Sequence, residues 1–465
     1  MLPNFPKTRP FTAVKTTVYN KSENTIRRVR FMKKRLLFLT AVAFGLFVCV
    51  LSATAGGQKE SGATSTAAAQ PVTISYWFPT ADPVSDAYYS GVATDFMAKN
   101  PGIKIDITKV PSNPSDIDTK LNAALLSGTF PDVFLAYLVF IGTRGSHGDF
   151  ASLNSFIDNW SQKSDLFSSA LEMGKYKDQY LGVGFAPSPD ILTYRKDYFQ
   201  EAGLDPNKPP TTWEQLASDA LKLTQRDSQG NVIRAGLDMP ALSPALVFVE
   251  PFMRQNGCKV IDEVKQVPAF DTPQCAQALQ YLADLYQKKE SIPYNFQQLS
   301  TSPFVSGRAA MAYLTPDVIQ GMIQTDPTME AKLGFAPVMS RTDRVAFCGY
   351  RLWTIGASSK HKDAAWKFIE YLMSSEQVWK RYTDLKVPVV LNSLKQKFVA
   401  DNPSFNNILV DYVEYGKGKA VVPWTGLANK YMALAYQQAI TGKMSAAQAL
   451  HVAQTGLENE LKQGQ

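Results

Sequence analysis

The alternation of strand and helix patterns early in the chain most narrows what it can fold into. Residues 72–78 and 103–110 are rich in β-branched and aromatic side chains, and residues 133–136 form a short apolar run. Helical patterns over residues 86–99 and 115–126 separate these runs. A strand–helix–strand repeat of this kind joins parallel strands by right-handed crossovers. The sequence therefore predicts an α/β fold.

The third of these strands ends at a residue that can face a ligand. In residues 125–137 (LLSGTFPDVFLAY), Gly128 ends a helix and Pro131 starts the strand. Open α/β sheets bind ligands at the carboxyl ends of their strands, where Tyr137 falls. We expect Asp132 to fix the turn into the strand. The alternative for Tyr137 is packing in the core, where aromatic side chains usually lie.

The rest of the body continues the α/β mixture. Short strands are expected over residues 191–194, 333–338 and 349–356, and helices over residues 196–202, 272–288, 363–373 and 445–461. Capping-box spacing starts helices at Thr212 and Ser445, which are followed three residues later by Gln215 and Gln448. Residues 304–314 are expected to run from helix to strand through a glycine stop, and the glycine-rich residues 142–148 are expected to form a mobile surface loop.

The first 55 residues differ from the body in charge. Residues 1–35 hold ten basic residues and one acidic residue, so the remainder is slightly negative although the whole chain carries +7. The body therefore has no global electrostatic reason to bind nucleic acid.

This leader, residues 1–55, reads as a secretion signal with its start at Met32. Basic residues and an apolar run over residues 36–51 precede an A-x-A cleavage motif at residues 53–55. An uncleaved membrane anchor and lipidation at Cys49 are the alternatives. The small, polar residues 56–70 are expected to form a flexible tether. The protein is thus expected in the periplasm or outside the cell, either free or tethered to the membrane.

Cysteine and histidine spacing gives no metal motif. Cys258 and Cys275 are close enough in sequence for a disulfide, which export would permit. Two separate buried thiols fit the sequence equally well. Cys348 is expected to be a buried free thiol, and no metal or cofactor is expected.

The sequence lacks the common catalytic signatures, including a G-x-S-x-G elbow, a Walker A loop, an H-E-x-x-H pair and a dinucleotide fingerprint. Aromatic residues do fall near predicted strand ends, close to charged residues. A sugar site needs this combination, because sugars present an apolar face and a ring of hydroxyls. For any single aromatic residue, however, a place in the core remains the alternative.

Six segments then occur in a recognisable order: LLSGTFPDVFLAY, ILTYRKDYFQEAGLD, PPTTWEQL, FVSGRAAMAYLTPD, GYRLWTIGASSKHKDAAWKFIEYLMSSE and ITGKMSAAQAL. Each resembles a motif of the family 1 extracellular solute-binding proteins of ABC importers, the maltose- and multiple-sugar-binding type. The resemblance covers essentially residues 72–461. Two positions depart from the family pattern, since Arg195 replaces the usual Asn and Asp317 replaces a Trp.

The resemblance implies a two-lobe, periplasmic-binding-protein-like (type II) fold with a hinge and an interlobe cleft. The first lobe would contain residues 71–186 and 335–379, and the second lobe would contain residues 187–334 and 380–465. The implied function is capture of a carbohydrate between the lobes and its delivery to a membrane permease. Such a protein is expected to act as a monomer and to break no bond.

The expected ligand contacts combine strand-end aromatic and charged residues with positions that the resemblance implies. They are Trp77, Tyr137, Glu250, Asp317, Tyr350, Arg351 and Trp424. A neutral saccharide or an acidic sugar would fit this set. The alternative functions are a secreted carbohydrate-active enzyme, a chemoreceptor-type sensing protein and a binder of a non-sugar solute.

Overall fold

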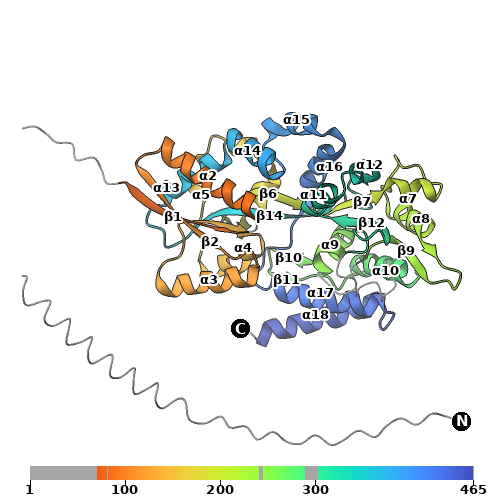
Figure 1. Ribbon diagram of the computed structural model, residues 1–465. Helices are drawn as coiled ribbons and strands as arrows, with labels where there is room; N and C mark the ends of the chain where they lie inside the picture. The colour runs from red at the N-terminus through yellow and green to blue at the C-terminus, as the bar shows by residue number, and fades with distance from the viewer. Residues whose placement is uncertain (1–70, 81, 240–244, 289–301, 464–465) are drawn as a thin grey trace, which may run out of the picture. The chain divides into compact units, whose positions relative to one another are not determined.

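The computed structural model describes residues 71–80, 82–239, 245–288 and 302–463 (Figure 1). The leader and the tether lie outside these residues, so the expectations for them stay predictions. Among the described residues, none of the helices is both long and apolar enough to cross a membrane.

The first sheet is built around the predicted strand–helix repeat. It contains, in spatial order, β15 (Gly416–Lys417), β14 (Ala346–Ile355), β3 (Val133–Tyr137), β1 (Val72–Pro79) and β2 (Ile103–Val110), with β6 (Val183–Pro189) paired to β14. β1 is parallel to both β2 and β3, as the sequence predicts. β14 runs antiparallel to β3 and β6, so the sheet is mixed.

The second sheet contains later segments of the chain. Its spatial order is β13 (Leu333–Phe335), β7 (Ile191–Arg195), β12 (Ala309–Leu314), β9 (Val232–Leu237) and β8 (Gln225–Arg226). β12 is parallel to β9 and antiparallel to β7. Two small hairpins pair β4 (Lys175–Tyr176) with β5 (Gln179–Tyr180) and β10 (Ile261–Asp262) with β11 (Val267–Pro268).

Helices follow most strands. Those before the second sheet begins are α2 (Pro83–Lys99), α3 (Pro114–Ser127), α4 (Val139–His147), α5 (Asn154–Asp158), η1 (Lys163–Asp165) and α6 (Ser168–Glu172). The middle of the chain adds α7 (Lys196–Glu201), α8 (Trp213–Leu223), α9 (Ala245–Gln255), α10 (Pro273–Gln287), α11 (Pro316–Thr325) and α12 (Met329–Lys332). The last part adds α13 (Lys362–Met373), α14 (Ser375–Leu385), α15 (Asn392–Asp401), α16 (Pro403–Glu414), α17 (Thr425–Ile440) and α18 (Ala446–Gln463).

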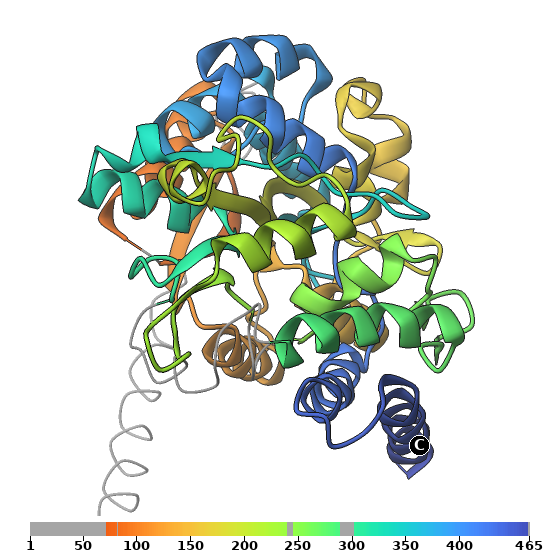
Figure 2. The same ribbon diagram turned by 90° about the vertical axis from the view of Figure 1, so that its right-hand side faces the viewer.

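Both predicted caps are present. The hydroxyl of Thr212 accepts a hydrogen bond from the backbone N–H of Gln215, although the Gln215 side chain turns to Thr211. Ser445 and Gln448 make the complete reciprocal box, which begins α18. Figure 2 shows α18 beside α17, and both helices pack against α10. These contacts bury an apolar stripe of α18 that includes Leu450 and Leu457.

Asp132 has the structural role that the sequence predicts. Its carboxylate accepts hydrogen bonds from the backbone N–H and the hydroxyl of Ser75, at 2.8 and 2.9 Å, and from the hydroxyl of Ser359. The Ser75 hydroxyl also accepts from the backbone N–H of Asp132. Asp132 therefore ties the start of β3 to the middle of β1.

The chain crosses three times between the first sheet and the part of the molecule that contains the second sheet. β6 of the first sheet leads through the single residue Asp190 into β7 of the second sheet. β13 returns to β14 through residues 336–345, and β15 leads through residues 418–424 to α17. Multiple crossings are what a hinge between two lobes requires.

The expectation of a mobile loop over residues 142–148 is wrong, because these residues form most of α4. A Cβ atom on Gly142 would lie 2.6 Å from the carbonyl oxygen of Val422, and one on Gly145 would lie 2.5 Å from Leu181. These glycines allow close packing of the helix. Arg144 of the same helix is 2% exposed and forms ion pairs with Asp118 and Asp149.

Two other expectations need correction. Residues 304–307 form turns, and regular structure begins only at β12. β13 ends at Phe335, three residues earlier than expected.

Cys258 and Cys275 form a disulfide, with their Cα atoms 5.2 Å apart, and Cys348 is a buried free thiol.

Candidate functional site

The carboxyl edge of the first sheet brings together two of the predicted site residues. Tyr137, the last residue of β3, lies directly opposite Arg351 of the antiparallel strand β14. The guanidinium carbon of Arg351 is 5.6 Å from the centroid of the Tyr137 ring. Both side chains are only partly buried. The Tyr137 hydroxyl donates a hydrogen bond to the carbonyl of Ser112, which orients the ring.

Asp82 starts α2 at the same edge. Its carboxylate accepts hydrogen bonds from the backbone N–H groups of Val84 and Ser85 and from the Ser85 hydroxyl, which lower its pKa. Arg351 lowers this pKa further, by a smaller amount. Asp82 is thus held in place as a helix cap near the guanidinium.

The buried phenol of Tyr89 lies behind Arg351. Burial raises the pKa of Tyr89, and the positive charges of Arg351 and Arg381 oppose this shift. Arg381 is 1% exposed and lies 4.8 Å over the Phe185 ring. The first-sheet edge therefore has one cation at its surface and another in the core behind it.

Trp77 and Tyr350 do not join this partly open group. Trp77 is 9% exposed and belongs to the core, with Lys120 Nζ 5.3 Å from its ring centroid. Tyr350 is 3% exposed, and its hydroxyl shares a hydrogen bond of 2.7 Å with Ser169. Burial raises the pKa of Tyr350 well above its ordinary value. Both predicted contacts are therefore mostly or wholly buried in this structure.

The carboxyl edge of the second sheet holds two carboxylates. Asp317 lies in the first turn of α11, just after β12, and is exposed. Asp190 immediately precedes β7, whose first residue Ile191 pairs with Leu314 at the end of β12. The two carboxylates therefore lie at the same edge. Burial, and to a smaller extent the charge of Asp317, raise the pKa of Asp190 to about 7, while Lys419 opposes the shift.

Sequence reasoning missed Asp190. Its raised pKa depends on burial and on neighbours that are distant in sequence, so its spacing carries no signal of either. The available signal was its position directly before the strand expected over residues 191–194. That position became meaningful only when the structure showed β6 before it and β7 after it in different sheets.

Glu250 is a buried ion-pair residue. It is 3% exposed on α9, and its Oε1 lies 2.6 Å from the guanidinium of Arg254. Burial raises the pKa of Glu250, and Arg254 opposes the shift. Among the described groups, Oε2 of Glu250 has no hydrogen-bond partner. Burial also lowers the pKa of Lys419, while Glu250 and Asp190 oppose that shift, so Lys419 connects the two carboxylates electrostatically.

Trp424 precedes α17 and is partly buried. The turn before it, residues 420–423, lies against α4. Thr143 of α4 donates a hydrogen bond to the carbonyl of Pro423, and Gly142 packs on the backbone of Val422. α4, which follows Tyr137 directly, therefore positions the turn that carries Trp424.

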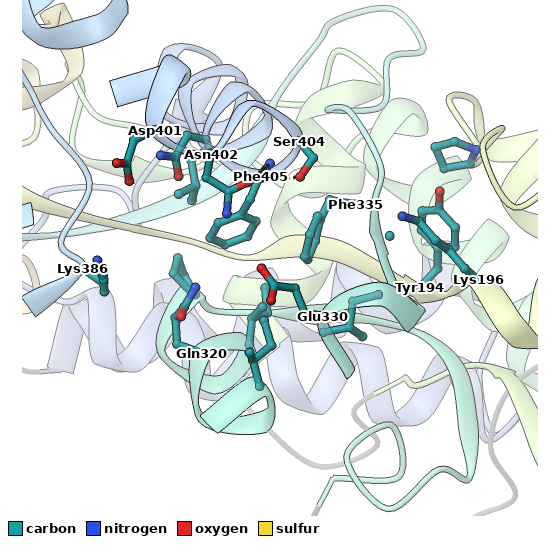
Figure 3. Close-up of a pocket in the computed structure, with 18 of the residues that line it drawn as sticks. Tyr194, Lys196, Gln320, Glu330, Phe335, Lys386, Asp401, Asn402, Ser404 and Phe405 are labelled. Atoms are coloured by element: carbon teal, nitrogen blue, oxygen red, sulfur yellow. Dashed lines mark hydrogen bonds between the residues drawn. The ribbon is translucent and has the colours of Figure 1, made fainter. Parts of the chain in front are cut away.

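A separate cavity of about 490 Å³ lies outside the predicted site (Figure 3). Its walls come from β7, α11, α12 and β13 on one side and from α14–α16 on the other. The rings of Phe335 and Phe405 lie 4.6 Å apart within it, among charged residues that include Lys196, Glu330 and Asp401. The seven predicted residues lie elsewhere. Within the described part of the chain, clusters of His, Cys, Asp or Glu suited to a metal ion are absent.

Comparison with known proteins agrees with the predicted family. Residues 80–379 match the family model described as bacterial extracellular solute-binding protein. A maltotriose-binding protein of Pyrococcus abyssi is 24% identical over 345 residues, covering 72% of this chain and 68% of that protein. An sn-glycerol-3-phosphate-binding periplasmic protein of Pectobacterium atrosepticum is 26% identical over 242 residues. The chain spans about half, 52%, of the length of this second relative.

Solved structures share the fold. The cyclic alpha-maltosyl-1,6-maltose binding protein of Arthrobacter globiformis has a TM-score of 0.73 at 23% identity, covering 84% of this chain and 100% of that one. The sugar-binding protein MalE of Xanthomonas citri has a TM-score of 0.74 at 20% identity, covering 84% and 98%. The predicted two-lobe α/β fold is confirmed. With a family model that matches well over half of its residues, the chain belongs to the bacterial extracellular solute-binding proteins.

Proposed function

We propose that this protein is the substrate-binding component of an ABC importer and that it captures a carbohydrate between its two lobes. The observation that carries the proposal is the pairing of Tyr137 with Arg351 at the carboxyl edge of the first sheet. An aromatic face beside a fixed polar group is what a sugar ring requires. Asp190 and Asp317 supply acceptors for hydroxyl groups at the corresponding edge of the second sheet.

The proposed mechanism is closure of the lobes on the ligand. The three crossing segments supply the hinge, and a ligand that touches both sheet edges favours the closed form by the difference between its affinities for the two forms. The closed form then docks on a membrane permease. We propose that the protein acts as a monomer outside the cytoplasm, exported by the signal in its leader.

We propose one change to the expected division into lobes. The expected second lobe begins again at residue 380, yet β15 pairs with β14 in the first sheet. Asn392, at the start of α15, donates hydrogen bonds to the carbonyls of Asp165 and Leu166. We therefore propose that the first lobe keeps the chain to about residue 417 and that the crossing over residues 418–424 starts the last part of the second lobe.

One observation favours a second function. Asp190, with its pKa near 7, beside Asp317 is the kind of carboxylate pair in which a glycosidase separates a general acid from a base. A secreted carbohydrate-active enzyme would release smaller sugars when incubated with oligosaccharides. The importer component would return the oligosaccharide unchanged. Chromatography of such an incubation separates the two functions.

A thermal-shift screen against saccharides tests the main proposal. A ligand at 100 times its dissociation constant stabilises the folded protein by about 2.7 kcal/mol. We expect at least one saccharide to raise the melting temperature. If only a solute of another class raises it, carbohydrate binding is refuted while the family assignment stands.

A further inference from the structure

Arg351 lacks the acidic partner that five other arginines of the described residues have. Ion pairs to carboxylates are formed by Arg144, Arg195, Arg234, Arg254 and Arg344. Within the described residues, Arg351 has no carboxylate inside ion-pair distance, although it is partly buried. A guanidinium in such a position has donors without a strong acceptor, and its charge is incompletely screened by water.

Asp82 does not fill this role. Both of its carboxylate oxygens are used at the start of α2, where Oδ1 accepts from two backbone N–H groups at 2.9 Å and Oδ2 accepts from the Ser85 hydroxyl at 2.6 Å. The positive charge of Arg351 lowers the pKa of Asp82, but the three hydrogen bonds hold this carboxylate at the start of the helix, and none of them comes from Arg351.

The core behind Arg351 adds positive charge. Arg381 donates to the backbone carbonyls of Leu372 and Phe185, at 3.2 and 3.3 Å, and not to a carboxylate of the described residues. Carbonyl dipoles satisfy its hydrogen bonds without cancelling its charge. Neither guanidinium group near the first-sheet edge, that of Arg351 or that of Arg381, therefore has a carboxylate of the described residues at ion-pair distance.

The second-sheet edge has the opposite character. Asp317 is exposed there. Asp190 beside it stays protonated up to about pH 7, so it adds a hydrogen-bonding group but little negative charge. Carboxylates accept hydrogen bonds from sugar hydroxyls and repel an anionic substituent. A ligand with hydroxyls at one end and an anion at the other would therefore be bound in one orientation.

We propose that Arg351, flanked by the Tyr137 ring, binds the anionic group of an acidic saccharide, either a uronic acid carboxylate or a sugar phosphate. This inference rests on the proposed function and narrows its substrate class. The planar fork of a guanidinium matches the two oxygens of a carboxylate or phosphate, and the neighbouring ring offers a face for the sugar. A neutral sugar would leave the charge of Arg351 unpaired in the closed cleft.

The test is calorimetric titration of the full-length protein at constant ionic strength with matched ligands. The pairs are galactobiose with digalacturonate, glucose with glucuronate, and glucose with glucose 6-phosphate. We expect at least one acidic member to bind about tenfold or more tightly than its neutral counterpart, with the uronate and phosphate arms identifying the source of the anion.

Three variants assign the preference to Arg351. Arg351→Gln is expected to weaken the acidic ligand about 30-fold or more and the neutral ligand by a clearly smaller factor, so the acidic-to-neutral affinity ratio falls because the charge pair is lost. Arg351→Lys keeps the positive charge but loses the planar guanidinium fork. Its affinity for the acidic ligand should lie between the affinities of the wild type and of Arg351→Gln. Lys104→Gln is the matched control, since it removes an exposed charge from β2 opposite Thr73, away from the carboxyl edge. It should bind like the wild type.

Each outcome decides the inference. Wild-type protein that prefers neutral members, or Arg351→Gln that weakens both members equally, would overturn the anionic subsite but leave carbohydrate binding intact. Failure of every acidic saccharide in the set would overturn the anionic subsite, while carbohydrate binding itself is decided by the thermal-shift screen. If Arg351→Gln does not fold, the acidic-to-neutral affinity ratio of Arg351→Lys decides instead. A ratio equal to that of the wild type would show that the guanidinium fork does not bind the anionic group.

Discussion

Arg351 of β14 lies directly across the antiparallel register from Tyr137 of β3, with its guanidinium carbon 5.6 Å from the ring centroid. The pair stands at the carboxyl edge of a sheet whose neighbours α2 and α4 both begin at that edge. Rigid strands hold both side chains, so the pair is preorganised for a ligand.

Asp132 is expected to be one of the most important residues for the stability of the first sheet. Asp132→Ala removes the acceptor for Ser75 and for the Ser359 hydroxyl, leaving partly buried donors unsatisfied. We expect the free energy of unfolding in urea to fall by about 2–3 kcal/mol. Asp106→Ala, at an exposed position on β2, is the control and should change it by less than about 0.5 kcal/mol. Equal losses of unfolding free energy in both variants would show that Asp132 does not stabilise the contact between β3 and β1.

Asp190 predicts a pH dependence of stability. The folded protein keeps this carboxyl protonated up to about pH 7, whereas an unfolded chain releases the proton near pH 4. The folded state binds more protons than the unfolded state between about pH 4 and pH 7. The contribution of Asp190 to the free energy of unfolding therefore falls as the pH rises through this window.

Asp190→Asn removes that contribution. At pH 8 the variant should be more stable than the wild type, on the order of 1–2 kcal/mol after allowance for solvent screening, and at pH 4 the two should be equal. Asp343→Asn, at an exposed position on a crossing segment, is the matched control. Parallel pH profiles for wild type and Asp190→Asn would contradict the assignment.

Gly142 predicts a packing effect on α4. Gly142→Ala places a Cβ atom 2.6 Å from the Val422 carbonyl oxygen, so α4 must shift away from the turn that carries Trp424. We expect a loss of about 1–3 kcal/mol in thermal unfolding and weaker ligand binding. Gly91→Ala, at an open position in the middle of α2, should instead stabilise by about 0.5–1 kcal/mol. An increase in stability in both variants would mean that α4 is not packed as described.

The Cys258–Cys275 disulfide predicts a stability difference. Replacing both cysteines by serine opens a closed loop of 17 residues, and the chain-entropy model gives a loss of about 3 kcal/mol. Denaturation of the two forms measures the loss. Peptide mapping without reductant should recover the linked cysteines from the wild type, and recovery of two free thiols would contradict the pairing.

Local pattern predicted much of the first sheet. The strands and helices up to Tyr137 follow period-2 and period-3.6 patterns with clear turn residues, and the structure has them within a few residues of the expected ends. α4 was missed because its glycines resemble those of a loop, while their actual role, close approach to Val422, depends on a segment far along the chain. Sequence spacing cannot reveal such a contact.

The site was only partly predictable for similar reasons. Tyr350 and Arg351 are neighbours in a strand, so their side chains point to opposite faces; that alternation alone argued against placing both in the cleft. Tyr350 indeed packs inside against Ser169. Asp190 required knowledge that β6 and β7 belong to different sheets, and the burial of Glu250 beside Arg254 required the packing of α9.

The most direct test of the central claim is calorimetric titration of saccharides against variants from both sheet edges. The ligand found in the thermal-shift screen should bind the wild type with one-to-one stoichiometry. Tyr137→Ala from the first sheet and Asp317→Ala from the second should each weaken binding about tenfold or more, because a ligand between the lobes touches both edges. Wild-type affinity in both variants, or a complete lack of saccharide binding by the wild type, would contradict a carbohydrate site between these two sheets.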